Sequence, residues 1–276
     1  MKSRTLKSLV LVMCAVFVIS LLVGCAKKPA KYEDREVGDF VVRFYEDYDY
    51  CEIKGTTAQG NEKRFLVIPE YVDGVRVESL GIYYPFPAFD GTRVYRPEID
   101  SDKLEKVYFE ATTKMARNSF DVRDSYGDDL CPNIRKIFYP GLEVYPYSMT
   151  RHGYTVYYPR RIYENDRGAF YTGYSNTMPA NVSYYYNYEN AKNSGYYWID
   201  DYDYGEKIEL IPSDPTRDGY TFDGWHKNVD CMSEWDFDTD TLPEKKMAQV
   251  EGNGGLVERA VYQETILYAR WLPNQA

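Results

Sequence analysis

Alternating apolar and polar positions dominate the chain, and this period-two pattern predicts strands. Residues 40–45 and 50–54 form two such runs, joined through the acidic residues 46–49, and we expect them to pair as a hairpin. Residues 154–158 show the same alternation. Few stretches have helical periodicity, so the fold class we expect is mainly β.

A recurring phrase occupies the segment after this hairpin. Each copy has a short apolar run and then a second apolar segment: 66–69 with 75–81, 104–109 with 115–120, and 131–140 with 142–149. A last strand-like unit covers 154–159. Neither half of such a unit can bury its apolar face alone, so we expect neighbouring units to stack.

These units resemble the BspA-like class of leucine-rich repeat. The resemblance implies a short, irregular solenoid over residues 37–175, in which closing aromatic residues fill the space between coils: Phe89, Phe120 and Tyr147. The spacing departs from the family, because 40 residues separate Val67 from Val107 and only 30 separate Val107 from Ile137. The alternative is an unrelated β-rich domain.

A denser motif marks the C-terminal segment. The sequence PTRDGYTFDGW occupies residues 215–225, WDFD follows at 235–238, and LYARW ends the segment at 267–271. This pattern resembles the Listeria–Bacteroides repeat, the internalin B-repeat type, and the resemblance covers about 179–272. It implies a small β-grasp-like domain with a core of large rings: Phe222, Trp225, Trp235, Phe237 and Trp271.

One departure from the repeat is the insertion 243–264, for which we expect helical turns around a Gly-rich centre at 252–255. Turn-forming residues dominate 160–178, so we place the boundary between the two domains near Asn176.

The start of the chain has the order of a bacterial lipoprotein leader. Three basic residues precede a 15-residue apolar run, 9–23, which is short for a membrane-spanning helix of roughly 20 residues. Leu22-Val23-Gly24-Cys25 resembles a lipobox, which implies lipid on Cys25 and cleavage between Gly24 and Cys25. Residues 1–24 are then the signal peptide, and 25–36 are expected to be a flexible tether. An uncleaved membrane helix and an ordinary secretory signal are the alternatives.

The net charge limits the classes of binding partner that we expect. The chain has 33 basic and 43 acidic residues; removal of residues 1–24 takes away three basic residues and no acid, which leaves a net charge of −13. A surface this acidic argues against nucleic acid, whose binding requires clustered Lys and Arg. We therefore expect contact with the membrane through the lipid on Cys25, and an unidentified protein or glycan partner at the cell surface.

Tyrosine is the strongest compositional bias, with 30 Tyr against 2 His. The clusters 184–188 and 196–198 offer either an aromatic face for a glycan or protein partner or ordinary core packing, which we favour. In a strand, the middle ring of three consecutive tyrosines points to the face opposite its neighbours.

Residues with catalytic chemistry are few. His152 and His226 lack spaced metal-ligating partners, and no nucleophile motif is present. We interpret the acidic runs 46–49 and 200–203 as solvated strand ends, and consider calcium binding by Asp200, Asp201 and Asp203 the weaker alternative. We therefore predict no catalytic residue, no cofactor and no metal site, and hence no enzyme.

The cysteines do not predict a disulfide framework. Cys51, Cys131 and Cys231 remain after Cys14 leaves with the signal peptide and Cys25 is lipidated. Their odd number and wide spacing favour buried thiols, and a disulfide between two of them stays open.

The favoured hypothesis is a membrane-anchored binding or adhesion-type lipoprotein of the bacterial cell envelope, facing away from the cytoplasm. A structural or spacer lipoprotein is the alternative, and an enzyme acting on polysaccharide or peptide is the weakest reading. The step from fold to function is an analogy in each case.

Overall fold

The computed structural model describes residues 31–84, 93–95, 97–115, 120, 130–140, 154–161, 177–252 and 255–275. The predicted signal peptide and Cys25 therefore lie outside the described residues. Strands dominate the described residues, and the helical elements with bounds there are one turn at α2 (Ala58–Asn61) and a 3-10 turn, η2 (Asn193–Gly195). The mainly β class is confirmed. Across the described ranges, no helix combines the length and apolarity that a membrane crossing requires.

The first sheet contains the predicted hairpin. Its strands are β1 (Tyr32–Val37), β2 (Phe40–Tyr45), β3 (Tyr50–Thr56), β5 (Tyr71–Val72), β6 (Val75–Leu80) and β10 (Lys114–Met115). β1, β2 and β3 are antiparallel, whereas β3, β6 and β10 run parallel. A small separate pair joins β7 (Ile82–Tyr84) to β8 (Arg93–Tyr95).

The expected tether is too long by five residues. β1 begins at Tyr32 and pairs with all of β2, so residues 32–36 belong to the first sheet. Their side chains are exposed, which is why their polar sequence suggested a linker. Backbone pairing at a sheet edge needs no apolar side chain on that strand.

The second sheet is parallel throughout. Its order is β13-β12-β11-β9-β4, with bounds β4 (Phe65–Ile68), β9 (Lys106–Phe109), β11 (Lys136–Phe138), β12 (Thr155–Tyr158) and β13 (Thr177–Pro179). The strands predicted in each recurring phrase are therefore direct neighbours. Val107 pairs in register with Leu66 on one side and with Ile137 on the other. Both faces are buried, which explains the nearly continuous apolar runs of the sequence.

Alternate side chains of this sheet enter two different cores. Val107, Ile137 and Val156 point into the N-terminal core, together with buried Phe120. Their neighbours Tyr108, Phe138 and Tyr157 point to the other face and into the C-terminal core. Of the predicted closing aromatics, Phe120 is buried, and Phe89 and Tyr147 lie outside the described residues.

The C-terminal sheet has the order β15-β14-β19-β16: β14 (Val182–Tyr185), β15 (Tyr196–Asp200), β16 (Tyr220–His226) and β19 (Thr265–Pro273). The two central strands, β14 and β19, are parallel, and the outer strands are antiparallel to them. Gly224 lies in a β-bulge of β16 with φ +90°, and a Cβ there would approach the Glu234 carboxylate to 3.1 Å. The DGW motif thus needs its glycine.

The predicted core rings of this sheet are largely confirmed. Trp225 and Trp235 are buried, and Phe222, Phe237 and Trp271 are partly buried against the same cluster.

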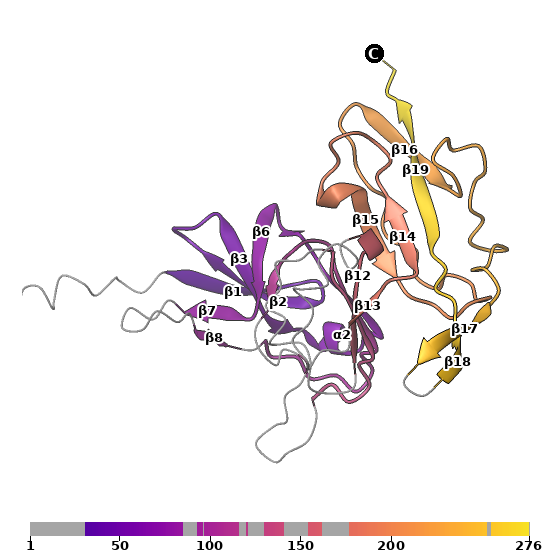
Figure 1. Ribbon diagram of the computed structural model, residues 1–276. Coiled ribbons are helices and arrows are strands. Elements are labelled where there is room, and N and C mark those ends of the chain that lie inside the picture. Colours follow the sequence, from indigo (N-terminus) through magenta and orange to yellow (C-terminus); the bar gives the residue numbers. More distant parts are fainter. Residues whose placement is uncertain are drawn as a thin grey trace, which may run out of the picture.

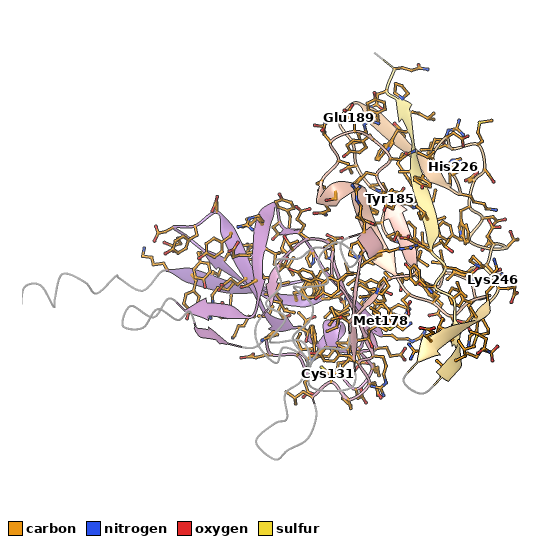
Figure 2. The ribbon with its side chains drawn as sticks, viewed as in Figure 1. Cys131, Met178, Tyr185, Glu189, His226 and Lys246 are labelled. Carbon is orange, nitrogen blue, oxygen red and sulfur yellow. The ribbon has the colours of Figure 1, made fainter. Side chains whose placement is uncertain are left out.

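The insertion 243–264 is a hairpin, and our expectation of helical turns was wrong. β17 (Met247–Gly252) pairs with β18 (Gly255–Ala260) across the Gly-rich turn. Two short runs around such a turn are the sequence signal of a hairpin. Every described side chain of β18 is exposed, and the hairpin projects from the rest of the chain next to Lys246, which Figure 2 labels.

The boundary between the two parts lies slightly later than residues 175–179. β13 pairs with β12 and so completes the parallel sheet, and the chain enters β14 only three residues after β13 ends. We name residues 31–180 the N-terminal body and 181–275 the C-terminal body. Figure 1 shows the C-terminal body lying against one side of the parallel sheet.

A stack of rings joins the two bodies. Tyr108 stacks on Phe138 at 4.6 Å between ring centroids, and Phe138 stacks on Tyr157 at 5.1 Å. From the C-terminal body, Trp198 stacks on Tyr108 at 4.7 Å. The outer face of the parallel sheet is therefore covered by the second body, and each ring removes a large apolar area from water.

A buried ionic cluster lies at the edge of this stack. Asp200 is fully buried, accepts a hydrogen bond from the Tyr108 hydroxyl at 2.9 Å, and lies 3.6 Å from the Lys106 ammonium. Lys136 donates to the Asp201 carboxylate at 2.8 Å. Our interpretation of 200–203 as solvated was wrong for Asp200, because its partners come from the other body.

Removal of the Lys106 charge should destabilise the protein. Lys106→Met leaves the fully buried Asp200 carboxylate without its ammonium, so we expect a loss of about 3 kcal/mol in the free energy of unfolding. Adding Asp200→Asn should recover most of the loss. Urea unfolding at pH 7, followed by tryptophan fluorescence, measures both; equal stability of the single variant and the wild type would contradict the assignment.

The same carboxyl predicts a pH dependence. Burial raises the pKa of Asp200 to about 6 against a usual value of 3.8, so the folded chain holds this proton over a pH range in which the unfolded chain has released it. The free energy of unfolding of the wild type, relative to the Asp200→Asn/Lys106→Met variant, should therefore fall as pH rises from about 4 to about 7. A difference that stays flat or rises would contradict the shifted pKa.

The projecting hairpin should be dispensable for stability. Replacing residues 247–260 by two glycines removes mainly exposed side chains, so we expect the free energy of unfolding to change by less than about 0.5 kcal/mol. Leu267→Ala, at a fully buried position of β19, is the contrasting variant, with an expected loss of about 3 kcal/mol. A hairpin deletion as damaging as Leu267→Ala would show that these strands pack against the body.

Candidate functional site: the cleft between the two bodies

A cleft of about 580 Å³ lies where the two bodies meet. The N-terminal body contributes Glu70 and Glu110, and the C-terminal body contributes the remaining wall. That wall comes from the segment after β14, from β15 and from the loop before β16: Tyr186, Tyr188, Lys192, Tyr197, Trp198, Ser213, Asp214, Pro215, Thr216, Arg217 and Asp218. Both bodies therefore contribute to the cleft.

Rings form the floor of the cleft. Tyr186 is 4% exposed and Trp198 is 6% exposed, so these two offer little surface to solvent. One face of Trp198 is covered by Tyr108, and Tyr197 stacks on Trp225 at 5.7 Å. The same stack that joins the bodies therefore also fixes the floor.

The Tyr197 hydroxyl is the polar centre of that floor. It donates to the Ser213 carbonyl oxygen at 2.5 Å. Burial raises the pKa of Tyr197, and the negative charges of Glu110 and Asp214 raise it further. Two carboxylates, one from each body, thus act on a single hydroxyl.

An ion pair spans the mouth of the cleft. The Lys192 ammonium contacts the Glu70 carboxylate, and Glu70 is three-quarters buried at its side chain. The Glu70 backbone N–H donates to the Glu110 carboxylate at 3.1 Å. Burial raises the pKa of Tyr186 to about 12, and the nearby Lys192 opposes this shift. The glutamates are thus fixed relative to the tyrosines.

Arg217, from the PTRDGY motif, is held by aromatic faces. Its guanidinium lies 3.6 Å from the ring centroid of Tyr220 and 4.5 Å from that of Tyr188. Trp271 is 5.8 Å away, and its indole N–H donates to the Tyr186 carbonyl oxygen at 2.5 Å. This arrangement stabilises the wall by cation–π attraction and commits the positive charge of Arg217 to the protein itself.

The tyrosine clusters are divided between the core and the cleft. Tyr184 and Tyr196 are almost completely buried, as core packing requires, and Tyr185, labelled in Figure 2, occupies the opposite face of β14. Tyr186, next along the chain, lines the cleft. Further on, Tyr188 lies just before Glu189, also labelled in Figure 2, and it too lines the cleft.

Sequence reasoning missed Glu70, Glu110 and Arg217. The two glutamates end strand phrases in the N-terminal body, 122 residues from Lys192 in the case of Glu70. The position of each glutamate directly after an apolar strand was the available signal, but nothing local linked them to the C-terminal body.

Among the described residues, the other candidates of the sequence analysis do not lie together. His152 lies outside the described residues. His226, labelled in Figure 2, is buried, and neither ring nitrogen has a hydrogen-bond partner among the described residues. Within the same ranges, no three His, Cys, Asp or Glu side chains are grouped to hold a metal ion, Asp200, Asp201 and Asp203 included.

The three remaining cysteines are thiols. Cys51 and Cys131 are buried, Cys231 is partly exposed, and none of the three is in a disulfide. Burial raises the pKa of Cys51 and of Cys131 to about 11, which keeps both thiols protonated and unreactive at neutral pH.

The comparisons with known proteins concern the C-terminal body. A search of curated proteins and a search of solved structures each find no match for this chain. The family model of the Listeria–Bacteroides repeat domain matches residues 181–248, which contain β14, β15, β16 and most of the cleft wall. The C-terminal body thus contains a segment that matches the Listeria–Bacteroides repeat domain.

Proposed function

We propose that this protein is a membrane-anchored surface lipoprotein that binds a partner in the cleft between its two bodies. The observation that carries the proposal is the cleft itself, which both bodies build over a floor of packed rings. Its volume is within the range of small-ligand and peptide sites, roughly 300–1,000 Å³. Interdomain clefts are preferred binding positions because two rigid walls can present groups that neither wall has alone.

The anchoring part of the proposal rests on the leader. Basic residues, a short apolar run and the Leu22-Val23-Gly24-Cys25 motif occur in the order that lipid attachment requires. Two acyl chains on one residue hold a protein at a bilayer, since each buried methylene contributes about 0.8 kcal/mol. The Listeria–Bacteroides repeat supports a surface position.

For the N-terminal body, we propose a short and irregular leucine-rich-repeat solenoid of BspA-like type. The support is the parallel sheet, in which successive recurring phrases contribute adjacent strands in register. The second strands of the first two recurring phrases are β6 and β10. They lie in the other sheet, where β3, β6 and β10 run parallel to one another. Stacked strands from consecutive repeats are what a solenoid requires.

For the C-terminal body, we propose a β-grasp-like fold. The support is the mixed sheet in which the first strand, β14, and the last strand, β19, lie side by side and parallel. The insertion that contains β17 and β18 lies between β16 and β19 in the sequence. It does not interrupt the pairing of β14 with β19.

Lipid attachment is tested at Cys25. Cys25→Ser removes the sulfur that would carry the diacylglycerol, so we expect loss of labelled palmitate incorporation and retention of the unprocessed precursor. Cys14→Ser, inside the apolar run, is the matched control and should be labelled and processed as the wild type is. Normal labelling of Cys25→Ser would exclude Cys25 as the lipid site.

Binding in the cleft is tested by filling it. Thr216 is exposed and lines the cleft, so Thr216→Trp should obstruct it without disturbing the core. We expect saturable binding of the full chain to bacterial or host surface extracts to weaken by about tenfold, or ~1.4 kcal/mol. Thr241→Trp is the matched control, because Thr241 is equally exposed and does not line the cleft.

Two outcomes would contradict cleft binding. Equal affinity of Thr216→Trp and Thr241→Trp would place the binding surface elsewhere. No saturable binding by the wild type, together with a weakened cell envelope on deletion, would favour the spacer role.

A further inference from the structure

The charged groups of the cleft are unbalanced. Its walls carry four carboxylates and two cations, a formal charge of −2. Both cations are already engaged: Lys192 contacts Glu70, and Arg217 lies over aromatic rings. An incoming group therefore meets an excess of negative charge within a partly enclosed space.

Two of the carboxylates come from different bodies. Glu110 belongs to the N-terminal body and Asp214 to the C-terminal body, and both line the same cleft as Tyr197. Asp218, further along the same loop as Asp214, is exposed. A positive group above Tyr197 would be attracted by both walls at once, and the reduced dielectric of a cleft strengthens this attraction relative to open water.

The rings are not arranged as a platform for neutral sugars. Trp198 is 6% exposed and already stacks on Tyr108, and Tyr197 stacks on Trp225. Tyr188 is covered on one face by the Arg217 guanidinium. The Tyr197 hydroxyl, by contrast, forms an exposed hydrogen bond. A hydroxyl oxygen can accept a hydrogen bond from an ammonium or guanidinium group beside a carboxylate.

We propose that the cleft binds a basic peptide segment, with Lys or Arg side chains placed between Glu110 and Asp214; this rests on the proposed function of the cleft as the binding site. Each cation contacts carboxylates from both walls, so binding also ties the two bodies together. The net charge of −13 on the mature chain attracts such a segment from a distance, and the cleft supplies the local contacts.

The test uses the full chain in mild detergent and a fluorescein-labelled tetralysine peptide, read by fluorescence anisotropy. Glu110→Gln/Asp214→Asn removes both of these charges and keeps the side-chain shapes. Asp47→Asn/Glu251→Gln is the matched control, because it removes two exposed charges from outside the cleft. We expect the cleft variant to weaken tetralysine binding by about tenfold and the control by less than about twofold.

Tetraglutamate and a neutral N-acetylglucosamine tetramer complete the design as competitors. We expect neither to displace tetralysine. An equal loss of affinity in the cleft variant and the control would reduce the effect to the overall charge and overturn the inference.

Failure of this inference is distinguishable from failure of the proposed function. If the wild type does not bind tetralysine but Thr216→Trp still abolishes binding to surface extracts, the cleft remains the binding site and its ligand is not basic. If Thr216→Trp has no effect on surface-extract binding, the proposed function fails whatever the peptide result.

Discussion

The outer face of the parallel sheet is the constraint on which the rest of the molecule depends. Tyr108, Phe138 and Tyr157 lie in a row on that face, and a row of rings in water would be a large exposed apolar patch. The C-terminal body covers it with Trp198. The recurring phrases of the N-terminal body and the motif-bearing segment of the C-terminal body therefore each form one side of a single buried interface.

The ionic cluster at this interface selects one docked arrangement. A small displacement of apolar rings against one another costs little stability. Displacing the partners of a buried carboxylate costs several kcal/mol. Across the interface, Asp200 is contacted by Tyr108 and Lys106, and Asp201 by Lys136. The Asn181 side chain adds a reciprocal pair of hydrogen bonds with the Tyr202 backbone and so holds the turn that carries both aspartates. We infer that rings supply the affinity between the bodies and the ion pairs supply the register.

Local sequence predicted what local forces decide. Alternation located the strands of the first hairpin and of the recurring phrases, because each strand buries one or both faces in a way that the period records. The sequence did not predict the bulge at Gly224, where a positive φ excludes most other residues. The insertion was misread because short runs of mixed polarity do not distinguish a helical turn from a hairpin strand; the Gly-rich turn was the better signal. Asp200 was misread because an acidic run is ordinarily solvated, and its lysine partner, Lys106, belongs to the other body.

The cleft is unpredictable from sequence for the same reason, and this links it to the interface. Glu70 and Glu110 follow apolar strands of one body, while Tyr197 and Asp214 belong to the other, and only docking brings them to one place. A ligand that contacts both walls must therefore stabilise the docked state, because it binds the separated bodies less well. By the same linkage, any change that weakens the ring stack or the Asp200 cluster reduces affinity in the cleft, without touching a residue that lines it. The buried interface thus determines both the shape of the cleft and its affinity for a ligand.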